Sequence, residues 1–340
     1  MVHKVVLIPG DGIGPEVSTA VREILSAASA PVEFEEHLAG EVALQHGGKE
    51  LLPADTLQAI RTHRVALKGP CTTPIGGGFG SVNVALRKTL KMFAAVRPVR
   101  NMPGIATRYR DVDIVIVREN TEGLYSGLEN VITDDVVVSL KVATRPACAR
   151  IAEFAFHYAV QRKRKRVTVL HKANIMKMTD GMFLEEARKA RDRYPSIEYD
   201  EMIIDAAMMR LVRDPTPFDI VLCENLYGDL VSDLCAGMVG GLGVAPGANI
   251  GDDCAVFESV HGSAPDIAGK NLANPLALLM SATMMLNHLA TTRGDEACAE
   301  AADRIKAAYD TALNEGQTTT DLGGKLGTRE FAQAVIAHLA

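Results

Sequence analysis

The chain has 340 residues and a formal net charge of −6, with 47% hydrophobic and 23% charged residues. This length favours two domains, and this composition is typical of a soluble globular protein. The negative charge argues against a general nucleic-acid-binding protein, whose surface would be basic. No apolar run approaches the ~20 residues that are needed to span a bilayer. We therefore expect a soluble protein with neither nucleic-acid nor membrane partners.

The six cysteines are widely scattered and form no C-x-x-C pair. This spacing supports neither a zinc site nor a disulfide framework, so we expect reduced thiols in a cytosol-like compartment. Met1 leads directly into an expected strand, and we expect no signal peptide.

Short β-rich runs alternate with helical patterns along the chain, which is typical of an α/β protein. Strands are expected at residues 5–8, 65–67, 113–117, 136–142, 167–170 and 219–223. Helices are expected at roughly 15–29, 146–161, 180–193, 226–239, 275–289, 296–314 and 329–339. Segments 70–80 and 240–253 are rich in glycine, and we expect both to be long loops of the kind that carry function.

The first motif, VVLIPGDGIGPEV, joins an expected strand to an expected helix. Gly10, Gly12 and Gly14 allow a tight turn, and Pro15 suits the first turn of a helix because its missing N–H is harmless there. The dinucleotide-binding fingerprint requires G-x-G-x-x-G, whereas the glycines here follow G-x-G-x-G. The residues alone leave open whether this turn binds a phosphate.

Three arginines and two neutral polar residues follow in the first half of the chain. Singly, each arginine is most simply a surface or ion-pair residue. Together they offer planar donors that match carboxylates in a bidentate manner. Beside a metal site, such a set indicates a small polycarboxylate ligand. The residues are Ser81, Asn83, Arg87, Arg97 and Arg118.

Tyr125 and Lys172, each beside an expected strand, are candidates for proton transfer. Side chains of these two types titrate well above pH 7 in water, so catalysis would require local tuning. A structural role is the simpler alternative for each alone. The basic run 162–166 is either an anion-binding or nuclear-address patch or, more simply, the exposed end of a helix before a strand.

Asp229 and Asp233 lie four residues apart on an expected helix, so both carboxylates project from one face. Like charges at this spacing repel, and a divalent cation such as Mg²⁺ would offset that cost. The alternative is a solvated acidic helix face. Asp205 follows an apolar run, and it is costly to bury unless it is paired, binds metal, or faces water at a strand end. Three acids within 30 residues shift the balance towards a metal.

In order, the motifs IPGDGIGPEV, RENTEGLYSG, HKANIMK, NLYGDLVSDLCAGMVGGLG and HGSAPDIAGK resemble those of the β-decarboxylating dehydrogenases. This family comprises isocitrate, 3-isopropylmalate and homoisocitrate dehydrogenases, and the resemblance runs nearly end to end. It implies oxidation of a 2-hydroxy acid by hydride transfer to NAD(P)⁺, followed by release of CO₂ from the neighbouring carbon. It also implies the two-domain α/β fold of this family, which is not a standard Rossmann domain.

The resemblance implies a role for each residue that matches a family motif. Asp205, Asp229 and Asp233 match the ligands of Mg²⁺ or Mn²⁺. Lys172 matches the residue that helps to take the hydroxyl proton, and Tyr125 matches the acid that protonates the enolate. The substrate-binding positions are Ser81, Asn83, Arg87, Arg97, Arg118 and Asn174. The cofactor-binding positions are Lys68, Thr72, Thr73, Glu258, His261, Gly262, Ala264, Asp266, Ile267 and Asn274.

The segment before Arg87 reads S-x-N-x-x-L-R, as in isocitrate dehydrogenases, whereas isopropylmalate enzymes place apolar residues there. The segment TTPIGGG at 72–78 is also of the isocitrate type. Asp266 and Ile267 match the NAD-linked members, because a carboxylate accepts hydrogen bonds from the ribose hydroxyls and repels a 2′-phosphate. We therefore expect an NAD-dependent isocitrate dehydrogenase activity of the tricarboxylic acid cycle. The alternatives are a homoisocitrate dehydrogenase and a non-catalytic regulatory subunit.

The resemblance also implies a discontinuous large domain, 1–92 with 240–340, that binds the cofactor. The small domain would span 93–239, with a dimer-contact segment near 123–144. We expect a homodimer in which the partner supplies Lys172 and Asp205, located in the cytoplasm or the mitochondrial matrix. The glycine turn at 10–14 would then be a strand-to-helix turn beside the nucleotide cleft, and cofactor recognition would be assigned mainly to residues 258–274.

Overall fold

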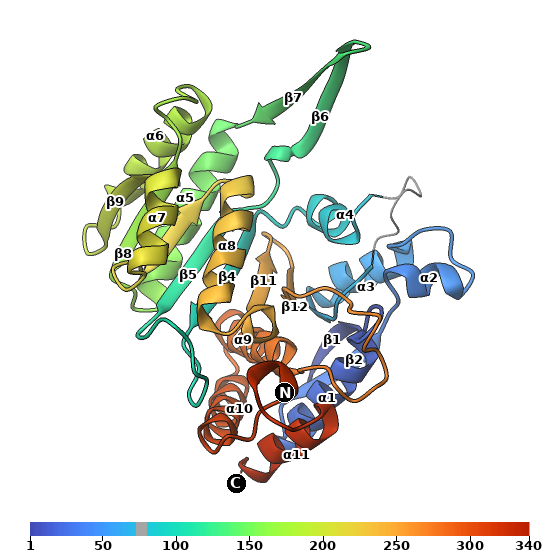
Figure 1. Ribbon diagram of the computed structural model, residues 1–340. Helices are drawn as coiled ribbons and strands as arrows, with labels where there is room; N and C mark the ends of the chain where they lie inside the picture. The colour runs from blue at the N-terminus through green and yellow to red at the C-terminus, as the bar shows by residue number, and fades with distance from the viewer. Residues whose placement is uncertain (73–79, 340) are drawn as a thin grey trace. The chain divides into compact units, whose positions relative to one another are not determined.

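The computed structural model describes residues 1–72 and 80–339 (Figure 1). The chain divides into two compact units. The first comprises Met1–Leu90, Met102–Thr107 and Val239–Ala340, and the second comprises Lys91–Asn101 and Arg108–Met238. The assignment of cofactor binding to a large domain stays a prediction. Residues 73–79, and with them the expected cofactor residue Thr73, lie outside the described part.

The first unit is built on strands in the order β2-β1-β3-β12-β11. Their bounds are β1 His3–Ile8, β2 Val32–Glu36, β3 Val65–Lys68, β11 Pro246–Ile250 and β12 Ala255–Ser259. All pairs are parallel except β11 with β12. Every residue of β3 and β12 is buried, as is typical of parallel strands that are covered on both faces. Ile8, Lys68 and Glu258 are in register, so the ends of three strands meet at one edge.

Helices cover the strands of the first unit. They are α1 Gly14–Ala27, α2 Glu41–Gln45, α3 Ala54–His63, α4 Val82–Thr89, α9 Leu276–Arg293, α10 Glu296–Asn314 and α11 Thr328–Ala337. Two 3₁₀ turns, η1 Leu242–Val244 and η2 Thr320–Leu322, are also present. Helix α9 packs against β3, β11 and β12 on one side and α10 on another. Buried residues occur all round its axis, as expected for a helix in the centre of a core.

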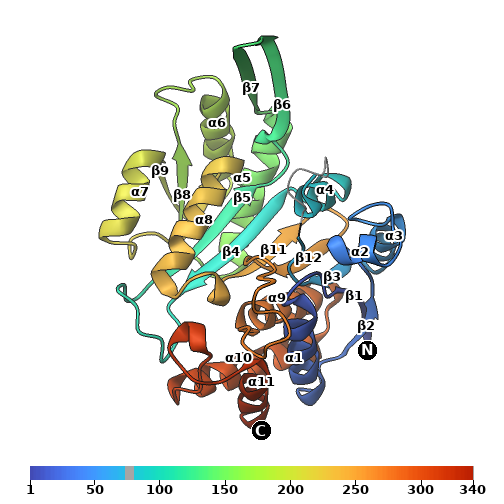
Figure 2. The ribbon, with the colours of Figure 1, turned by 45° about the vertical axis from the view of Figure 1, so that its right-hand side comes forward.

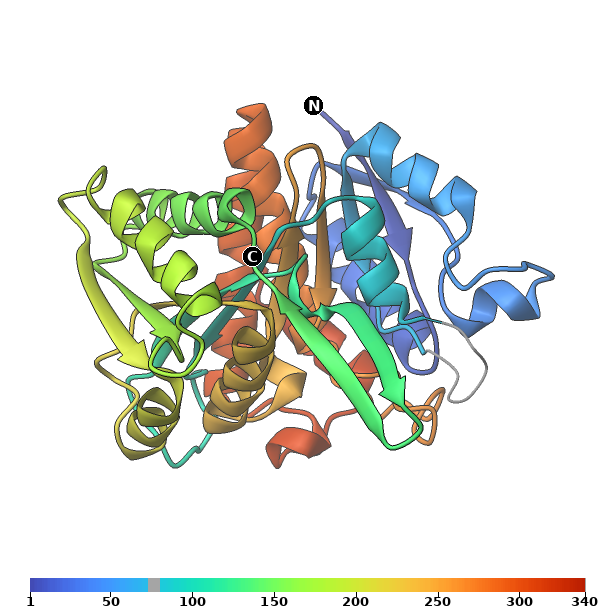
Figure 3. The same cartoon turned by 90° about the horizontal axis from the view of Figure 1, so that it is seen from above.

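The second unit is built on strands in the order β4-β5-β10-β8-β9. Their bounds are β4 Ala94–Arg100, β5 Asp113–Glu119, β8 Arg166–His171, β9 Glu198–Ile203 and β10 Ile220–Cys223. Only the β4–β5 pair is antiparallel. The helices α5 Arg145–Gln161 and α6 Thr179–Arg191 cover one face (Figures 1 and 3). The helices α7 Ile204–Arg213 and α8 Asn225–Val239 cover the other.

A two-stranded hairpin, β6 Gly123–Thr133 and β7 Val136–Val142, extends away from the other elements of the second unit (Figure 2). Its strands pair only with each other among the described residues. Apolar side chains along it are exposed, including Val131 at 71% and Val137 at 62%. Isolated two-stranded hairpins are marginally stable in water, so this one needs further contacts to be well ordered.

The expected long loop at 240–253 is a wrong prediction, because the segment contains η1 and β11. Gly247 lies opposite Glu258 in the β11–β12 ladder. The strand forms because β12 pairs with it, and a glycine-rich sequence gives no local sign of such a partner. The expected helix end before a strand at 162–166 is confirmed. Arg164 contacts Asp113 and Asp219, so this basic residue is neutralised locally.

All six cysteines are free, and five of them are buried. Among the described residues, no helix is both long and apolar enough to cross a membrane.

Candidate active site

Four of the expected site residues lie in or after the carboxyl ends of the parallel strands of the second unit. Arg118 is next to last in β5, and Asp229 lies in α8 directly after β10. Lys172 follows β8, and Asp205 follows β9 in the first turn of α7. Because these strands are parallel neighbours, their carboxyl ends share one edge. Ligands of open α/β sheets bind at this edge.

Arg118, Asp229 and Tyr125 form a compact cluster. Arg118 is 1% exposed and donates to Asn225 Oδ1 from Nε at 3.1 Å and from Nη2 at 2.7 Å. Its Nη1 donates to Asp229, and the Tyr125 hydroxyl donates to the other oxygen of the same carboxylate. The guanidinium lies 5.0 Å from the centre of the Tyr125 ring, a cation–π distance. A Cβ at Gly228 would lie 2.6 Å from Arg118 Cγ, so only glycine admits this arginine.

This cluster sets the protonation states of its members. Burial raises the pKa of Tyr125, and its hydrogen bond to the Asp229 carboxylate raises that pKa further. The phenol is therefore protonated at neutral pH, as a proton donor must be. Burial alone would raise the pKa of Asp229, but the charge of Arg118 and the Tyr125 hydrogen bond outweigh it and lower that pKa. Asp229 is thus an ionised carboxylate.

Arg97 adds a second cation to the acidic face of α8. Its Nη1 lies 3.3 Å from Asp233 Oδ1 and 3.8 Å from Asp229 Oδ1, and it hydrogen-bonds Ser232 at 2.5 Å. The arginine offsets the repulsion between the two aspartates, one helical turn apart. Asp229 is half-buried and fully paired, so the alternative of a merely solvated acidic face does not describe it. Two carboxylates at this spacing are suitable oxygen ligands for Mg²⁺.

Lys172 pairs with Asp205, apart from that cluster. The ammonium donates to the Asp205 carboxylate, which is 67% exposed. This hydrogen bond lowers the pKa of Asp205. Asn174 follows in the same exposed segment. No described group of three potential ligand atoms within 4.8 Å includes Asp205, so one chain does not gather the three expected metal ligands.

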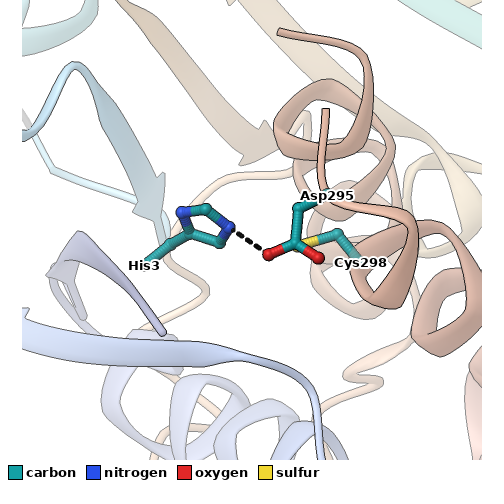
Figure 4. Close-up of side chains that lie close together, drawn as sticks. All are labelled: His3, Asp295 and Cys298. Carbon is teal, nitrogen blue, oxygen red and sulfur yellow. Dashed lines mark hydrogen bonds and ion pairs between the residues drawn. The ribbon is translucent and has the colours of Figure 1, made fainter. Parts of the chain in front are cut away.

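His3, Asp295 and Cys298 are the one described group that meets this distance criterion (Figure 4). Arg293 can only donate to His3 Nδ1, 3.1 Å away, so the ring carries its proton on Nε2 and donates it to Asp295 at 2.8 Å. That nitrogen then has no lone pair for a metal. Burial raises the pKa of Cys298 to about 11, which keeps the thiol protonated. Asp295 also caps α10, and the group is structural.

The first unit holds a second network of buried charges. Glu258, at the end of β12, accepts from Lys68 Nζ at 2.8 Å and from Arg87 Nη2 at 3.2 Å. Asn249 Nδ2 donates to the same carboxylate at 2.7 Å, and Asn249 Oδ1 accepts from Arg87 Nε at 3.0 Å. Burial opposes ionisation, but Lys68 and Arg87 together lower the pKa of Glu258 to about 2. The expected substrate residue Arg87 thereby belongs to the same network as the expected cofactor residues Lys68 and Glu258.

Helix α4 carries the other expected substrate residues of this unit. Ser81 is its N-cap and accepts from the amide of Val84 at 3.5 Å. Asn83 and Arg87 are four residues apart and therefore share a face of the helix. The Asn83 Oδ1 atom is enclosed and has no hydrogen-bond partner among the described residues.

The expected cofactor residues after β12 lie in the segment that leads to α9. His261 Nδ1 donates to the Gly262 carbonyl at 2.9 Å, and burial lowers the pKa of this histidine. Thr72 Oγ1 lies 2.6 Å from Ser263 Oγ, which links the two expected cofactor segments. Asn274 donates to Asp321 at 3.0 Å, and its Oδ1 accepts from the amide of Leu276 at the start of α9 at 2.9 Å. The remaining members of the segment are Gly262, Ala264, Asp266 and Ile267, of which the Asp266 carboxylate is exposed.

Three amides of the glycine turn after β1 are already paired with backbone carbonyls. The amide of Asp11 donates to Pro70 O at 2.7 Å, that of Ile13 to Ser263 O at 2.8 Å, and that of Gly14 to Asp11 O at 2.9 Å. A phosphate cradle needs such donors unpaired. The turn is instead a packing point, which confirms the expected strand-to-helix turn before α1.

Sequence reasoning missed three residues that hold the expected site in place. Asn225 begins α8 directly after a buried strand, a position that could have been flagged because polar residues gather at carboxyl ends of strands. Asn249 was hidden inside the expected loop at 240–253. Asp180 lies near the start of α6 and contacts the segment of Lys172.

Known proteins resemble this chain over almost its whole length. The sequence profile of the isocitrate/isopropylmalate dehydrogenase family matches residues 4–335. Catalytic subunit 5 of the mitochondrial NAD isocitrate dehydrogenase of Arabidopsis thaliana is 50% identical over 335 residues, which are 98% of this chain and 87% of that protein. The chloroplastic 3-isopropylmalate dehydrogenase of Solanum tuberosum is 52% identical over 287 residues, 84% of this chain and 80% of that protein.

Among solved structures, the crystal structure of isocitrate dehydrogenase from Methylococcus capsulatus matches with a TM-score of 0.92 at 45% identity. The match covers 99% of both chains. Relatives that are named for different substrates are thus about equally similar in sequence. The substrate must therefore be argued from the residues that would contact it.

Proposed function

Because this chain belongs to the isocitrate/isopropylmalate dehydrogenase family and shares its α/β fold, we propose that it oxidises isocitrate to 2-oxoglutarate and CO₂ with NAD⁺. The observation that carries this choice is the polar character of α4, with Ser81 at the N-cap and Asn83 and Arg87 on one face. These groups can hydrogen-bond a third carboxylate. An alkyl substituent would offer no partner to the Ser81 hydroxyl and the Asn83 amide, and polar sites reject such ligands strongly.

The proposal assigns the other two arginines to the remaining substrate carboxylates. Arg97 and Arg118 are largely buried and now pair with Asp229, so they are already desolvated and oriented. Asn225 fixes two nitrogens of Arg118, and its third nitrogen donates to Asp229. Preorganised donors of this kind stabilise developing negative charge without reorganising during the reaction.

The donor set at α8 fits Mg²⁺ or Mn²⁺. Asp229 and Asp233 would hold the cation, together with Asp205 supplied by a second copy of the chain. When bound there, the cation would acidify the substrate hydroxyl and offset the charge of the enolate. Asp229 is ionised and lies beside the arginines that we assign to the substrate.

Two side chains handle protons in this proposal. Lys172, paired with Asp205, takes part in removing the hydroxyl proton. Tyr125 keeps its proton at neutral pH because of burial and the Asp229 carboxylate, and it delivers that proton to the enolate carbon after CO₂ leaves. In this order of events, Lys172 acts before hydride transfer and Tyr125 acts in the last step.

For the cofactor we propose NAD⁺ rather than NADP⁺. The carboxylate of Asp266 is exposed in the segment between β12 and α9, where it can accept hydrogen bonds from ribose hydroxyls and repel a 2′-phosphate. The measurement is kcat/KM with each cofactor, and a higher value with NADP⁺ would contradict the assignment.

For the assembly we propose a homodimer that shares its active sites through the hairpin β6–β7. The exposed apolar residues of this hairpin support a contact with a second copy, because marginal hairpins need such burial. We place the protein in a soluble compartment that keeps thiols reduced, either the cytoplasm or the mitochondrial matrix. The alternative of a regulatory subunit would need an incomplete catalytic set, whereas Tyr125, Lys172 and the aspartates are all present.

The test is the rate of NADH formation by the purified chain with isocitrate, homoisocitrate or 3-isopropylmalate, each with and without Mg²⁺. We expect metal-dependent turnover with isocitrate and at least ~10-fold lower kcat/KM with the other acids, in line with the discrimination of polar sites. Preference for homoisocitrate would replace the substrate assignment. Absence of turnover by the isolated chain, despite a folded state, would favour the regulatory alternative.

A further inference from the structure

Asp180 is a buried carboxylate that joins three elements of the second unit. It lies near the start of α6 and is 3% exposed. The proposed chemistry does not use it, yet it contacts the segments that carry the proposed catalytic groups. We propose that Asp180 is a positioning residue that holds Lys172 in its reactive place. This inference rests on the proposed function, in which Lys172 transfers a proton.

One oxygen of Asp180 fixes the backbone at Lys172. Its Oδ2 atom accepts from the amide nitrogen of Lys172 at 2.7 Å and from the hydroxyl of Tyr227 at 3.3 Å. The amide of Asp180 in turn donates to Met176 O at 3.1 Å, and the amide of Met176 donates to Lys172 O at 2.9 Å. Asp180 therefore stabilises the turn that begins at Lys172 in two ways: its carboxylate binds the Lys172 amide, and its own amide binds Met176 O.

The other oxygen ties this turn to the hairpin. Asp180 Oδ1 accepts from Lys141 Nζ at 2.6 Å, and Lys141 lies in β7. The same ammonium lies 4.6 Å from the centre of the Tyr227 ring. Tyr227 is two residues before Asp229 in α8, and β7 pairs with β6, which carries Tyr125. One carboxylate thus contacts the backbone of the proposed base, the helix that carries Asp229, and the hairpin that carries the proposed acid.

The chemistry of a lysine base makes such support necessary. Lys172 has a long flexible side chain and is partly exposed, so its packing alone does not fix the ammonium. A misplacement of about 1 Å of a reacting group can cost about 100-fold in rate. Asp180 constrains the Cα of Lys172 and so the space that its Nζ can reach. A purely structural role is the competing explanation, and it predicts that the effect of removing Asp180 does not depend on Lys172.

The experiment is a double-mutant cycle in the full-length enzyme. Asp180→Ala should lower kcat about 10- to 100-fold while KM for NAD⁺ stays within about threefold. In a Lys172→Met background, Asp180→Ala should change the residual kcat less than about twofold, because the effect passes through Lys172. The residual rate should be measurable, since losing a general base costs about 10²–10⁴-fold. Equal factors in both backgrounds would overturn the proposal.

Glu186 supplies the matched control. It lies on the same helix, is similarly buried and pairs with Arg145 and Lys189, which both lie outside the turn of Lys172. Glu186→Ala should lower Tm comparably and leave kcat within about twofold. If Asp180→Ala does not fold, Asp180→Asn must show the same dependence on Lys172, and an additive loss there also overturns the proposal. Failure of the wild type to oxidise isocitrate would instead refute the proposed function.

Discussion

The Glu258 carboxylate is enclosed by two cations, so its removal should lower the free energy of unfolding. Buried charges are tolerated when they are paired, and removing one member of a buried pair typically costs about 3–5 kcal/mol because the others are left uncompensated. Lys68 is 1% exposed and Arg87 is buried as well, so neither can turn to water when the carboxylate is lost. The same three residues join the expected cofactor and substrate positions, and their geometry is therefore costly to disturb.

We predict that Glu258→Gln lowers Tm most at neutral pH and progressively less in acid. The folded pKa of Glu258, about 2, lies below the unfolded value for a glutamate of about 4.3, so its stabilisation is fully present above about pH 5. That stabilisation is lost as the pH falls through the folded pKa. Thermal unfolding of both proteins between pH 7 and 3 checks this. A difference in Tm that stays constant down to pH 3 would contradict it.

Sequence reasoning anticipated the kinds of residues in the site but not all their partners. An anionic partner was expected for Arg118, and Asp229 fills that position within the chain itself. Asn225, which holds two nitrogens of the same arginine, was not anticipated because its role depends on the ending of β10 beside β5. Adjacent strands are separated by about a hundred residues in sequence, so this pairing has no local pattern.

At the scale of elements, long periodic helices and several strands, including β3, β7 and β10, were predictable, whereas β6 and β9 were not. The expected helix at 296–314 coincides with α10, which begins at a capping Asp295 and has a continuous apolar face. Strand β9 was missed because its residues alternate weakly and lie at the edge of the unit. Strand β6 was missed because most of its residues are exposed and do not pack into the core of the second unit. Such elements are defined by their neighbours rather than by their own periodicity.

The hairpin β6–β7 gives a prediction at this scale. Val131→Asp should raise the dimer dissociation constant at least about tenfold, because a charge buried in an interface without a partner costs more than the ~1.4 kcal/mol that this factor represents. Analytical ultracentrifugation measures it. Val160→Asp, at an exposed valine of α5, is the matched control and should leave the dissociation constant unchanged. Equal effects of the two variants would refute a role of the hairpin in assembly.

At the scale of the whole molecule, our proposal requires the catalytic set to be distributed between copies. Within one chain Tyr125 contacts Asp229, while Lys172 contacts Asp205, and the structure describes no ligand group that unites Asp205 with Asp229. Neither sequence nor a single chain can specify how two copies meet, because this depends on surfaces that have no partner within the chain. Shared sites nevertheless have a measurable signature.

Mixing a Lys172→Ala chain with a Tyr125→Phe chain should restore activity that neither has alone. Half of randomly re-formed dimers are mixed, and each mixed dimer has one intact site, so about a quarter of the wild-type activity is expected for isologous dimers. The NADH assay after subunit exchange measures the recovery, with each variant exchanged alone as control. Activity no greater than the sum of the two controls would show that each site belongs to one chain.

The turn after β1 restricts which substitutions the folded protein tolerates. Gly10 and Gly12 have φ of 78° and 58°, and a Cβ on either would lie 2.0 Å from the carbonyl oxygen of Pro70 or Ser263. In a saturation-mutagenesis library, substitutions at both positions should therefore disappear already in a selection for soluble protein. Substitutions at Lys172 should survive that selection and disappear only when growth requires the enzyme. The glycine motif would then be required for folding. A scan that measures activity alone would wrongly assign Gly10 and Gly12 to cofactor binding.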